Sequence, residues 1–587
     1  MGGAMKTKLL GLALLMSSAA VLPMEAQSAE AAVDAEEEDV PGRGVARISL
    51  IHGDVSVKRG DSGEMTAAAL NAPLVIQDRI FTGLSSRAEL QFDHSNMIRM
   101  AANSEVRLAE IEQRRYIIQL ARGLVTFRVL REQQADVELS TPSISIRPVK
   151  PGAYRVEVKE DGTTEVAIRS GEAEIYTPQG TERVRAGRTV VARGTSTNPE
   201  FRDGIEVAED DWDNWNARRD RELQSSRSYQ YMSTDIYGGE DLDNHGRWVD
   251  VPQYGHVWSP YVASGWAPYR QGRWSWIDYY GWTWVSYDPW GWAPYHYGRW
   301  FNQAGYGWCW WPGGSGSRHF WRPALVGFLG WNSYGGFNAG LGFGFGRIGW
   351  TPLAPFERFR PWYGSRSYGG YRNNSYTNNN VRIVNNVNVT NIYRNARVTN
   401  GVSGADRADF VGGRGNRIRS FGDSDLRGAS SIQGRVPMVP ERQSLRLADR
   451  EVSQRGGGAS NTDNARFVSR RQPAQVERAS FDDQRRGMEQ ATRRAFGGGD
   501  TPAQTGGDAA RSSDAGWRRV GGDSGAVRGS DTVRESGRSA DGNGGWRTFG
   551  DSGRRSSSSQ ADSGRSSEAR AQRRRRYRRA EDHFNLR

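Results

Sequence analysis

Cysteine is almost absent from this sequence. The 587 residues include one cysteine, Cys309, which lies between Trp308 and Trp310. A single thiol cannot close an intrachain disulfide bridge, and it cannot supply the several thiolates of a zinc site. We therefore expect a fold without disulfide bridges, in which Cys309 is buried as a small apolar side chain.

Catalytic and metal-binding patterns are also missing. The seven histidines are scattered, with no His-x-x-x-His or His-Glu pair at ligand spacing, and no glycine-rich loop leads into Lys-Ser or Lys-Thr. Asp278 and Asp288 lie near an aromatic stretch and could form a glycosidase pair, but aspartate is also the ordinary turn residue at both places. We interpret the chain as a non-enzymatic protein with no catalytic residue, no metal site and no cofactor.

Long hydrophobic runs are confined to the N-terminus. Lys6 and Lys8 precede an apolar run from Leu9 to Leu22, and small residues follow it. This is the pattern of a secretory signal peptide over residues 1–29, because a membrane helix needs ~20 apolar residues. We expect a chain without a transmembrane span that is exported to the periplasm, outer envelope or exterior, and that begins with an acidic spacer at 30–44. An uncleaved N-terminal anchor is the alternative.

Short alternating strands punctuated by glycine follow over residues 45–195. Examples are Glu89 to Phe92, Val125 to Val129 and Tyr154 to Val158. Many short strands with regular turns predict an all-β sandwich or roll.

The same stretch carries a family resemblance. Its ordered motifs are Gly53-Asp54-Val55-Ser56-Val57, Asp78 to Gly83, Arg87 to Phe92, Gly123-Leu124-Val125 and Gly152 to Val156. They resemble the FecR domain of bacterial envelope proteins, although Asp93-His94-Ser95 stands where the family usually has Asp-Gly. The resemblance implies an exported β-domain used for interaction. We expect no counterpart of the anti-sigma segment of the namesake regulators, because only eight residues precede the apolar run.

Residues 206–230 predict a linking helix. Glu209, Asp210 and Asp211 precede Arg218 and Arg219, the order that suits the helix dipole. We expect a strut that packs one domain against the next, with a partner-binding helix as the alternative.

An aromatic repeat occupies residues 244–360. Gly-Arg-Trp recurs every 26 residues, starting at Gly246, Gly272 and Gly298. Trp and Tyr alternate at period two around turns that contain glycine, which predicts β-hairpins. These repeats resemble Trp/Tyr-rich envelope proteins of unknown function in which a FecR domain precedes them.

The density of tryptophan in this region leaves two interpretations open. Sixteen of the 21 tryptophans lie between Trp248 and Trp350. The rings fill a small core, or some of them also form an exposed ridge that stacks on sugars or other flat ligands. For such a ridge we select these binding positions: Trp266, Tyr269, Trp292, Tyr295, Trp258 and Trp284.

The remainder of the chain is poor in apolar residues. An Asn-rich segment at 361–400 contains one alternating stretch, Val381 to Ile392, and Gly, Ser, Asp and Arg dominate residues 401–587. This composition predicts a disordered tail that is solvated or binds anionic envelope polymers, with nucleic acid a weaker candidate. The residues expected to contact a polyanion are Arg573, Arg574, Arg575, Arg576, Arg578 and Arg579.

The sequence therefore predicts a mainly β, exported, non-enzymatic envelope protein. It consists of an N-terminal FecR-like sandwich or roll, a linking helix, Trp-rich β-hairpin repeats and a long disordered C-terminal tail. Our first hypothesis is binding to glycans or envelope proteins through the repeats and the Arg-rich tail. The alternatives are a signalling module that acts through a separate membrane protein, and a self-associating matrix or scaffold protein.

Overall fold

The structure is a computed structural model that describes residues 44–112, 114–132, 135–195, 198–332, 344–363, 381–385, 388–453, 465–474, 479–496 and 547–548. This part of the chain is mainly β, which confirms the predicted fold class. The predicted signal peptide, the acidic spacer up to residue 43 and the basic cluster at 573–579 lie outside the described residues. None of the helices in the described ranges is long and apolar enough to cross a membrane.

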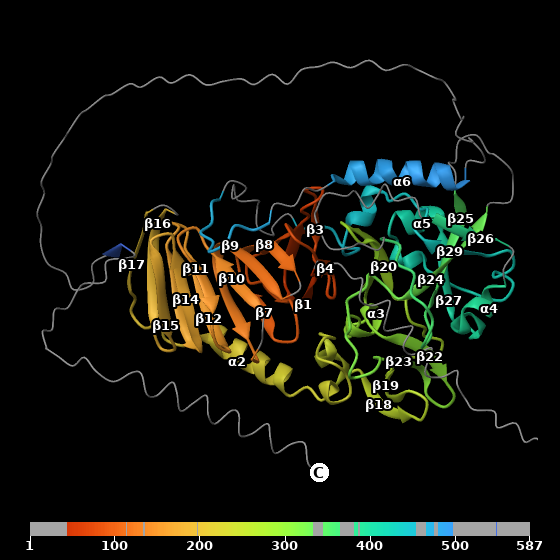
Figure 1. Cartoon of the computed structure of the whole chain (residues 1–587), viewed down its shortest axis with the longest axis horizontal. Coiled ribbons are helices and arrows are strands. Elements are labelled where there is room, and N and C mark those ends of the chain that lie inside the picture. The colour runs from red at the N-terminus through yellow and green to blue at the C-terminus, as the bar shows by residue number, and fades with distance from the viewer. Residues whose placement is uncertain are drawn as a thin grey trace, which may run out of the picture. The chain divides into compact units, whose positions relative to one another are not determined.

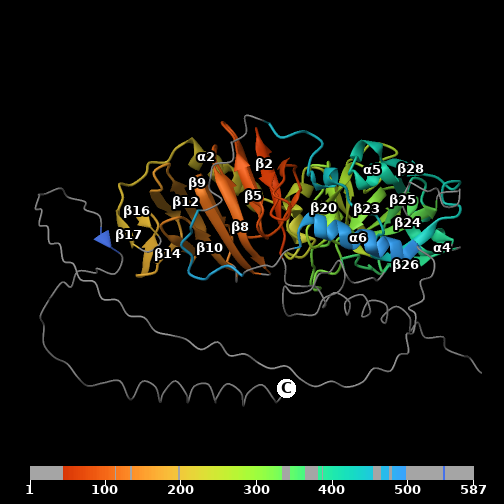
Figure 2. The same cartoon turned by 90° about the horizontal axis from the view of Figure 1, so that it is seen from above.

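The N-terminal β-domain consists of two rows of strands that share β9 (Arg115–Val129). The first half of β9 pairs with β8 (Glu105–Glu112) and, in parallel, with β10 (Asp136–Ser140). Its second half pairs with β7 (Asn96–Met100) and β12 (Gly152–Val158). Figures 1 and 2 show these strands side by side. The other strands are β1 (Ala46–His52), β2 (Val55–Lys58), β3 (Met65–Ala67), β4 (Pro73–Leu74), β5 (Arg79–Thr82), β6 (Arg87–Gln91), β11 (Ser145–Pro148), β13 (Thr164–Ser170), β14 (Glu172–Thr177), β15 (Gly180–Arg185), β16 (Thr189–Thr195) and β17 (Asn198–Asp203), and β30 (Arg547–Thr548) pairs with β17.

Helix α2 (Asp211–Gln224) lies within the range predicted for the linking helix. Asp210 caps it, because its side chain accepts a hydrogen bond from the Asp213 amide and the Asp213 side chain accepts one from the Asp210 amide. The Trp212 indole donates to Thr126 Oγ1 at 2.9 Å. The helix therefore packs on strand β9 of the β-domain.

Each copy of the 26-residue repeat forms an antiparallel hairpin, which confirms the predicted element. In each hairpin one tryptophan faces another across the strands: Trp248 and Trp258, Trp274 and Trp284, Trp300 and Trp310. The first and third hairpins join into a four-stranded sheet of order β18-β19-β23-β22, and the second is a two-stranded ribbon. The strands are β18 (Gly246–Val251), β19 (Gly255–Pro260), β20 (Gly272–Ile277), β21 (Gly281–Ser286), β22 (Arg299–Gln303) and β23 (Gly307–Trp311), and Cys309 on β23 is buried as expected.

The glycine that opens each copy explains a fixed spacing within the repeat. A Cβ atom on Gly272 would lie closer than 3.0 Å to the Trp284 ring, and the same holds for Gly246 with Trp258 and for Gly298 with Trp310. Each tryptophan therefore occupies the space that a side chain would need on the facing strand. Glycine and tryptophan must recur together at a fixed distance along the chain.

The folded part extends beyond residue 401, where the sequence predicted the tail to begin. Strands from both sides of that boundary form a six-stranded sheet of order β26-β29-β24-β25-β27-β28. The boundary was wrong because composition averaged over the tail hides short apolar segments, and Phe410 and Phe421 are buried. The strands are β24 (Val326–Asn332), β25 (Phe345–Pro352), β26 (Val381–Val384), β27 (Val402–Asp406), β28 (Arg419–Phe421) and β29 (Ser430–Gly434). The short helices are α3 (Ala293–His296), α4 (Val389–Ile392), α5 (Arg407–Val411), and the 3₁₀ turns η2 (Ser228–Gln230), η3 (Gly239–Leu242), η5 (Arg394–Arg397), η6 (Gly415–Arg417) and η7 (Arg442–Leu445).

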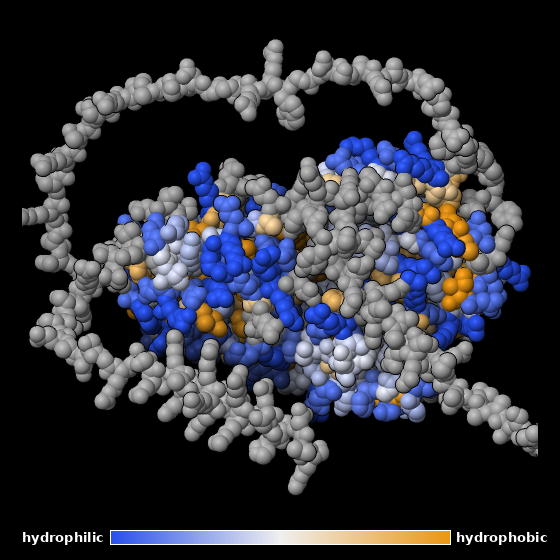
Figure 3. All heavy atoms as spheres, viewed as in Figure 1, coloured by the Kyte–Doolittle hydropathy of each residue, from blue (hydrophilic) through white to orange (hydrophobic). Residues whose placement is uncertain are grey.

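Helix α6 (Phe481–Phe496) lies across the aromatic region (Figures 1 and 2). Its outward surface is hydrophilic (Figure 3), and its inner face buries Phe481, Gln484 and Met488. Gln484 accepts a hydrogen bond from Trp276 Nε1 at 2.7 Å and donates one to Asp278 Oδ1 at 2.9 Å. A segment assigned to the tail by its composition thus covers the second hairpin.

We predict that Gly272→Ala lowers the free energy of unfolding by about 1–3 kcal/mol, because the new methyl group must displace the Trp284 ring or the backbone. Gly316→Ala is the matched control, since nothing lies within 4 Å of a Cβ atom built there. Urea unfolding followed by tryptophan fluorescence measures both. Equal midpoints for the two variants would contradict the packing explanation of the repeat.

We also predict that Gln484→Leu destabilises the aromatic region by about 1–3 kcal/mol, because it removes the acceptor for the Trp276 indole and the donor to Asp278. Arg485→Leu changes the neighbouring residue, which is exposed, and is expected to shift stability by less than about 0.5 kcal/mol. The same unfolding measurement compares them. If Arg485→Leu lowered the free energy of unfolding as much as Gln484→Leu, α6 would not pack with its Gln484 face against the second hairpin.

Candidate functional site

The six rings selected for an exposed ridge are buried in one aromatic core. The structure gives Trp258, Tyr269, Trp284, Trp292 and Tyr295 an exposure of 0%, and Trp266 one of 9%. Tyr269 contacts Trp284 and Tyr295 edge to face, and Trp266 packs against the buried Trp290. These six rings therefore form no exposed ridge, and the interpretation that they fill a small core is the one that fits their burial.

Hydrogen bonds inside the core explain this burial. The Tyr269 hydroxyl donates to the Tyr295 carbonyl at 2.7 Å and accepts from the Leu325 amide at 3.0 Å, and the Tyr295 hydroxyl donates to Asp288 Oδ2 at 2.6 Å. With their hydroxyl groups paired, burial of the Tyr269 and Tyr295 rings removes apolar area from water without leaving a hydroxyl group unsatisfied. Burial also raises the pKa of Asp288. Asp288 and Asp278 thus both have structural partners, in Tyr295 and Gln484.

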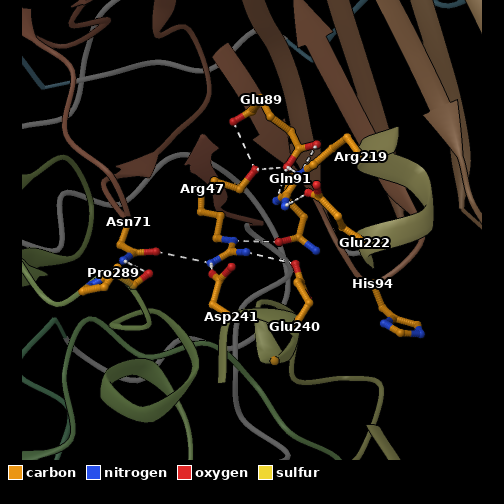
Figure 4. Close-up of polar contacts among 12 residues, drawn as sticks. Arg47, Asn71, Glu89, Gln91, His94, Arg219, Glu222, Glu240, Asp241 and Pro289 are labelled. Atoms are coloured by element: carbon orange, nitrogen blue, oxygen red, sulfur yellow. Dashed lines mark hydrogen bonds and ion pairs between the residues drawn. The ribbon is translucent and has the colours of Figure 1, made fainter. Parts of the chain in front are cut away.

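A buried cluster of charges connects the β-domain, α2 and the start of the aromatic region (Figure 4). We call it the joint network. Its members are Arg47, Asn71, Glu89, Gln91, Arg99, Arg219, Glu240 and Asp241.

Arg47, on β1, is the centre of the joint network and is fully buried. Its guanidinium group donates to Gln91 Oε1 at 2.6 Å, to Asp241 Oδ2 at 2.6 Å and to Glu240 Oε1 at 3.0 Å. A further bond reaches Asn71 Oδ1 at 3.2 Å. One arginine thus binds two carboxylates of η3 to the β-domain.

Glu89, on β6, is the second centre. It accepts hydrogen bonds from Arg99 Nε at 2.7 Å and from Arg219 Nη2 at 2.9 Å. Because Arg219 belongs to α2, this carboxylate fixes the helix to the β-domain. Helix α2, through Arg219, and η3, through Glu240 and Asp241, are therefore held by neighbouring parts of one network.

The pKa values follow from these contacts. Burial opposes the charge of Arg47, but Asp241 and Glu240 outweigh it and raise the pKa of the guanidinium group. Burial would raise the pKa of Glu89, yet Arg219 and Arg99 lower it to about 2. Burial raises the pKa of Asp241, and the nearby charge of Glu240 adds to this effect. The network therefore holds its charges, with Asp241 the carboxyl group that is easiest to protonate.

An open cleft with a volume of about 720 Å³ lies beside the joint network. We call it the joint cleft and define it by Arg219 and Glu222 of α2, Glu240 and Asp241 of η3, Tyr231, and Trp248 of β18. Three of these residues also belong to the joint network. A ligand in the cleft would therefore contact the groups that hold the β-domain to the rest of the chain.

Sequence reasoning missed this site. Arg47 lies in an alternating strand where its neighbours Ala46 and Ile48 are apolar, and a charged residue inside a buried strand is a weak signal of a buried ion pair. The acidic run Glu240 to Asp243 just before the first repeat is a second weak signal. Nothing in the sequence indicates that residues 194 positions apart would pair. No group of three or more His, Cys, Asp or Glu side chains with the arrangement of a metal site occurs in the ranges that the structure describes.

Two family models match separate parts of the chain. Residues 78–174 match the family described as FecR protein, and residues 239–357 match a family of unknown function, DUF6600. The chain matches no curated protein sequence.

Two solved structures are similar to part of the chain. Both are of a candidate anti-sigma factor from Parabacteroides distasonis, at 2.50 Å and 1.65 Å resolution, with identities of 18% and 17%. Each match covers 22% of this chain and 60% of the solved chain, with a TM-score of 0.20. The chain thus spans about 60% of the solved proteins that it matches.

The first family match covers the motifs from Asp78 onward and the strands that these motifs form. The second match covers the three aromatic hairpins. The protein therefore contains a FecR domain at residues 78–174, followed by a DUF6600 region that is rich in aromatic residues.

Proposed function

We propose that the protein is a non-enzymatic module of the cell envelope that signals through a separate membrane protein and receives its input at the joint cleft. The observation that carries this proposal is the joint network, in which residues of the cleft wall also anchor strands β1 and β6. FecR proteins are regulatory rather than enzymatic, which supports the signalling role. The N-terminal pattern of a signal peptide supports a place in the envelope.

The physical link between input and output is the buried charge. A partner that binds to Asp241 competes with Arg47, and one that binds to Glu222 competes with Arg219, which donates to both Glu222 and Glu89. A buried charge that loses a partner is strongly destabilised. Occupation of the cleft therefore changes how firmly η3 and α2 are held to the β-domain, which is the coupling that a signal requires.

Other roles have less support. Stacking on glycans by Trp266, Trp292 and the other four selected rings is not retained, because these rings lie in the core. Contact of the Arg573 to Arg579 cluster with anionic polymers stays a proposal based on charge alone. Self-association as a matrix protein has no described surface that favours it.

We predict that deletion of the gene changes the transcript levels of an extracytoplasmic sigma regulon, and that the wild-type gene restores them. Asn244→Trp places a large ring in the joint cleft and is expected not to restore them, because the natural partner can no longer enter. Ile205→Trp is the matched control, since Ile205 is 92% exposed and does not line the cleft. RNA sequencing gives the readout, and immunoblots confirm equal protein levels.

Two results would contradict the proposed function. The first is a transcriptome that does not respond to the deletion. The second is full restoration by Asn244→Trp, which would show that the signal does not depend on the joint cleft.

A further inference from the structure

Charges of both signs line the joint cleft in nearly equal number. The positive side chains are Arg219, Arg227 and Arg247, and the negative ones are Glu222, Glu240, Asp241 and Asp243. A polyanion would approach four carboxylates and a polycation three guanidinium groups, so both would be repelled by part of the wall. The lining favours an occupant with little net charge and many hydrogen-bonding groups.

Two aromatic rings form one wall of the cleft. Tyr231 and Trp248 are half-buried, and their ring centroids are 5.1 Å apart. The Trp248 indole donates to Ser228 Oγ at 3.0 Å, and the edge of the His256 ring contacts Tyr231 with centroids 4.8 Å apart. Rings that are fixed in this way lose little freedom on binding, which favours stacking against an apolar ligand face.

Polar groups complete the lining. Glu222 is 65% exposed, and the Asp241 side chain, whose Oδ2 atom accepts from Arg47, is still 18% exposed. Asn244 and Arg227 are exposed as well. The cleft thus offers carboxylate acceptors beside amide and guanidinium donors. Sugar hydroxyl groups both donate and accept, so they match a lining of this mixed kind.

The dimensions agree with a small ligand. A volume of about 720 Å³ lies within the ~300–1,000 Å³ that is typical of ligand sites, which occur preferentially at domain interfaces. A sugar ring also combines an apolar C–H face with polar edges, which suits an aromatic wall next to carboxylates. We propose that the joint cleft binds a neutral oligosaccharide, with one ring stacked on Tyr231 and Trp248 and its hydroxyl groups bonded to Glu222, Asp241 and Asn244.

This assignment rests on the proposed function, for which it names the chemical class of the input. It differs from the ridge that the sequence suggested, because the rings involved are the two half-buried ones at the edge of the first hairpin. It also predicts recognition by stacking and by hydrogen bonds from the hydroxyl groups of an uncharged ligand, with no role for attraction to phosphate.

The test is isothermal titration of the full chain with a tetrasaccharide of N-acetylglucosamine as the neutral probe. We expect saturable binding that Tyr231→Ala weakens roughly three- to tenfold through loss of one stacked ring. Tyr261→Ala is the matched control, because Tyr261 is 66% exposed and does not line the cleft. Binding is expected to change little between low and high salt, unlike that of a polyanion.

Glu222→Gln distinguishes the sugar from a polyanion by the sign of its effect. A neutral sugar binds more weakly to this variant, because a carboxylate acceptor becomes an amide, whereas heparin, used as the polyanion probe, binds more tightly because a repelling charge is gone. Circular dichroism verifies that each variant is folded. Absence of saturable sugar binding, an equal loss in Tyr261→Ala, or tighter sugar binding to Glu222→Gln than to the wild type would overturn the inference.

The two proposals fail separately. If the tetrasaccharide does not bind but Asn244→Trp still abolishes the transcriptional response, the ligand class is wrong and the proposed function stands. If the tetrasaccharide binds and the transcriptome does not respond to the deletion, the cleft is a sugar site and the signalling role is wrong.

Discussion

A fully buried arginine imposes the main constraint on this protein. The guanidinium group of Arg47 has left water, which costs several kcal/mol per ion, and only close carboxylates with further hydrogen bonds offset that loss. Its partners are Gln91 on strand β6, Asn71 in a loop and Asp241 on η3. These three parts of the chain must therefore assemble together. Removal of one partner from such a pair costs about 3–5 kcal/mol. Loss of any one partner therefore weakens the whole joint.

Other long-range bonds strengthen the same connection. Arg59 of the β-domain donates to the carbonyl oxygens of Trp276 and Leu445 at 3.2 and 3.3 Å. Asn71 Nδ2 donates to the Asp288 carbonyl at 3.1 Å, so this residue is shared by the joint network and the second repeat. Further along, the Val468 amide donates to the Thr141 carbonyl at 2.9 Å, which returns the chain to the β-domain. The β-domain and the aromatic region therefore depend on each other for their buried polar groups.

The features that could be predicted from the sequence are those that depend on local patterns of residues. Alternating aromatics around Gly281 specify a hairpin, and the Gly272 to Trp284 spacing specifies which ring covers which backbone, so the repeat could be found from the chain alone. Alternation tells which residues share a face, but it does not tell what covers that face. Trp284 is covered by residues such as Trp350, and Trp282 by Phe410 from a segment whose composition suggested disorder. The six selected rings were placed outside for this reason, and Arg47 was missed because its partners lie far away in the sequence.

The position of Trp248 connects the core to the cleft. The four-stranded sheet has β18 at its edge, and Trp248 faces the fully buried Trp258 across the first hairpin. Trp248 is half-buried, whereas Trp258 is enclosed. The chain enters this edge directly from η3, and Asp241 is only seven positions before Trp248. An occupant that stacks on the exposed part of Trp248 thus lies next to the carboxylates that hold Arg47. The proposed recognition at this edge and the attachment of the β-domain would therefore depend on the same few residues, so a change in one would alter the other.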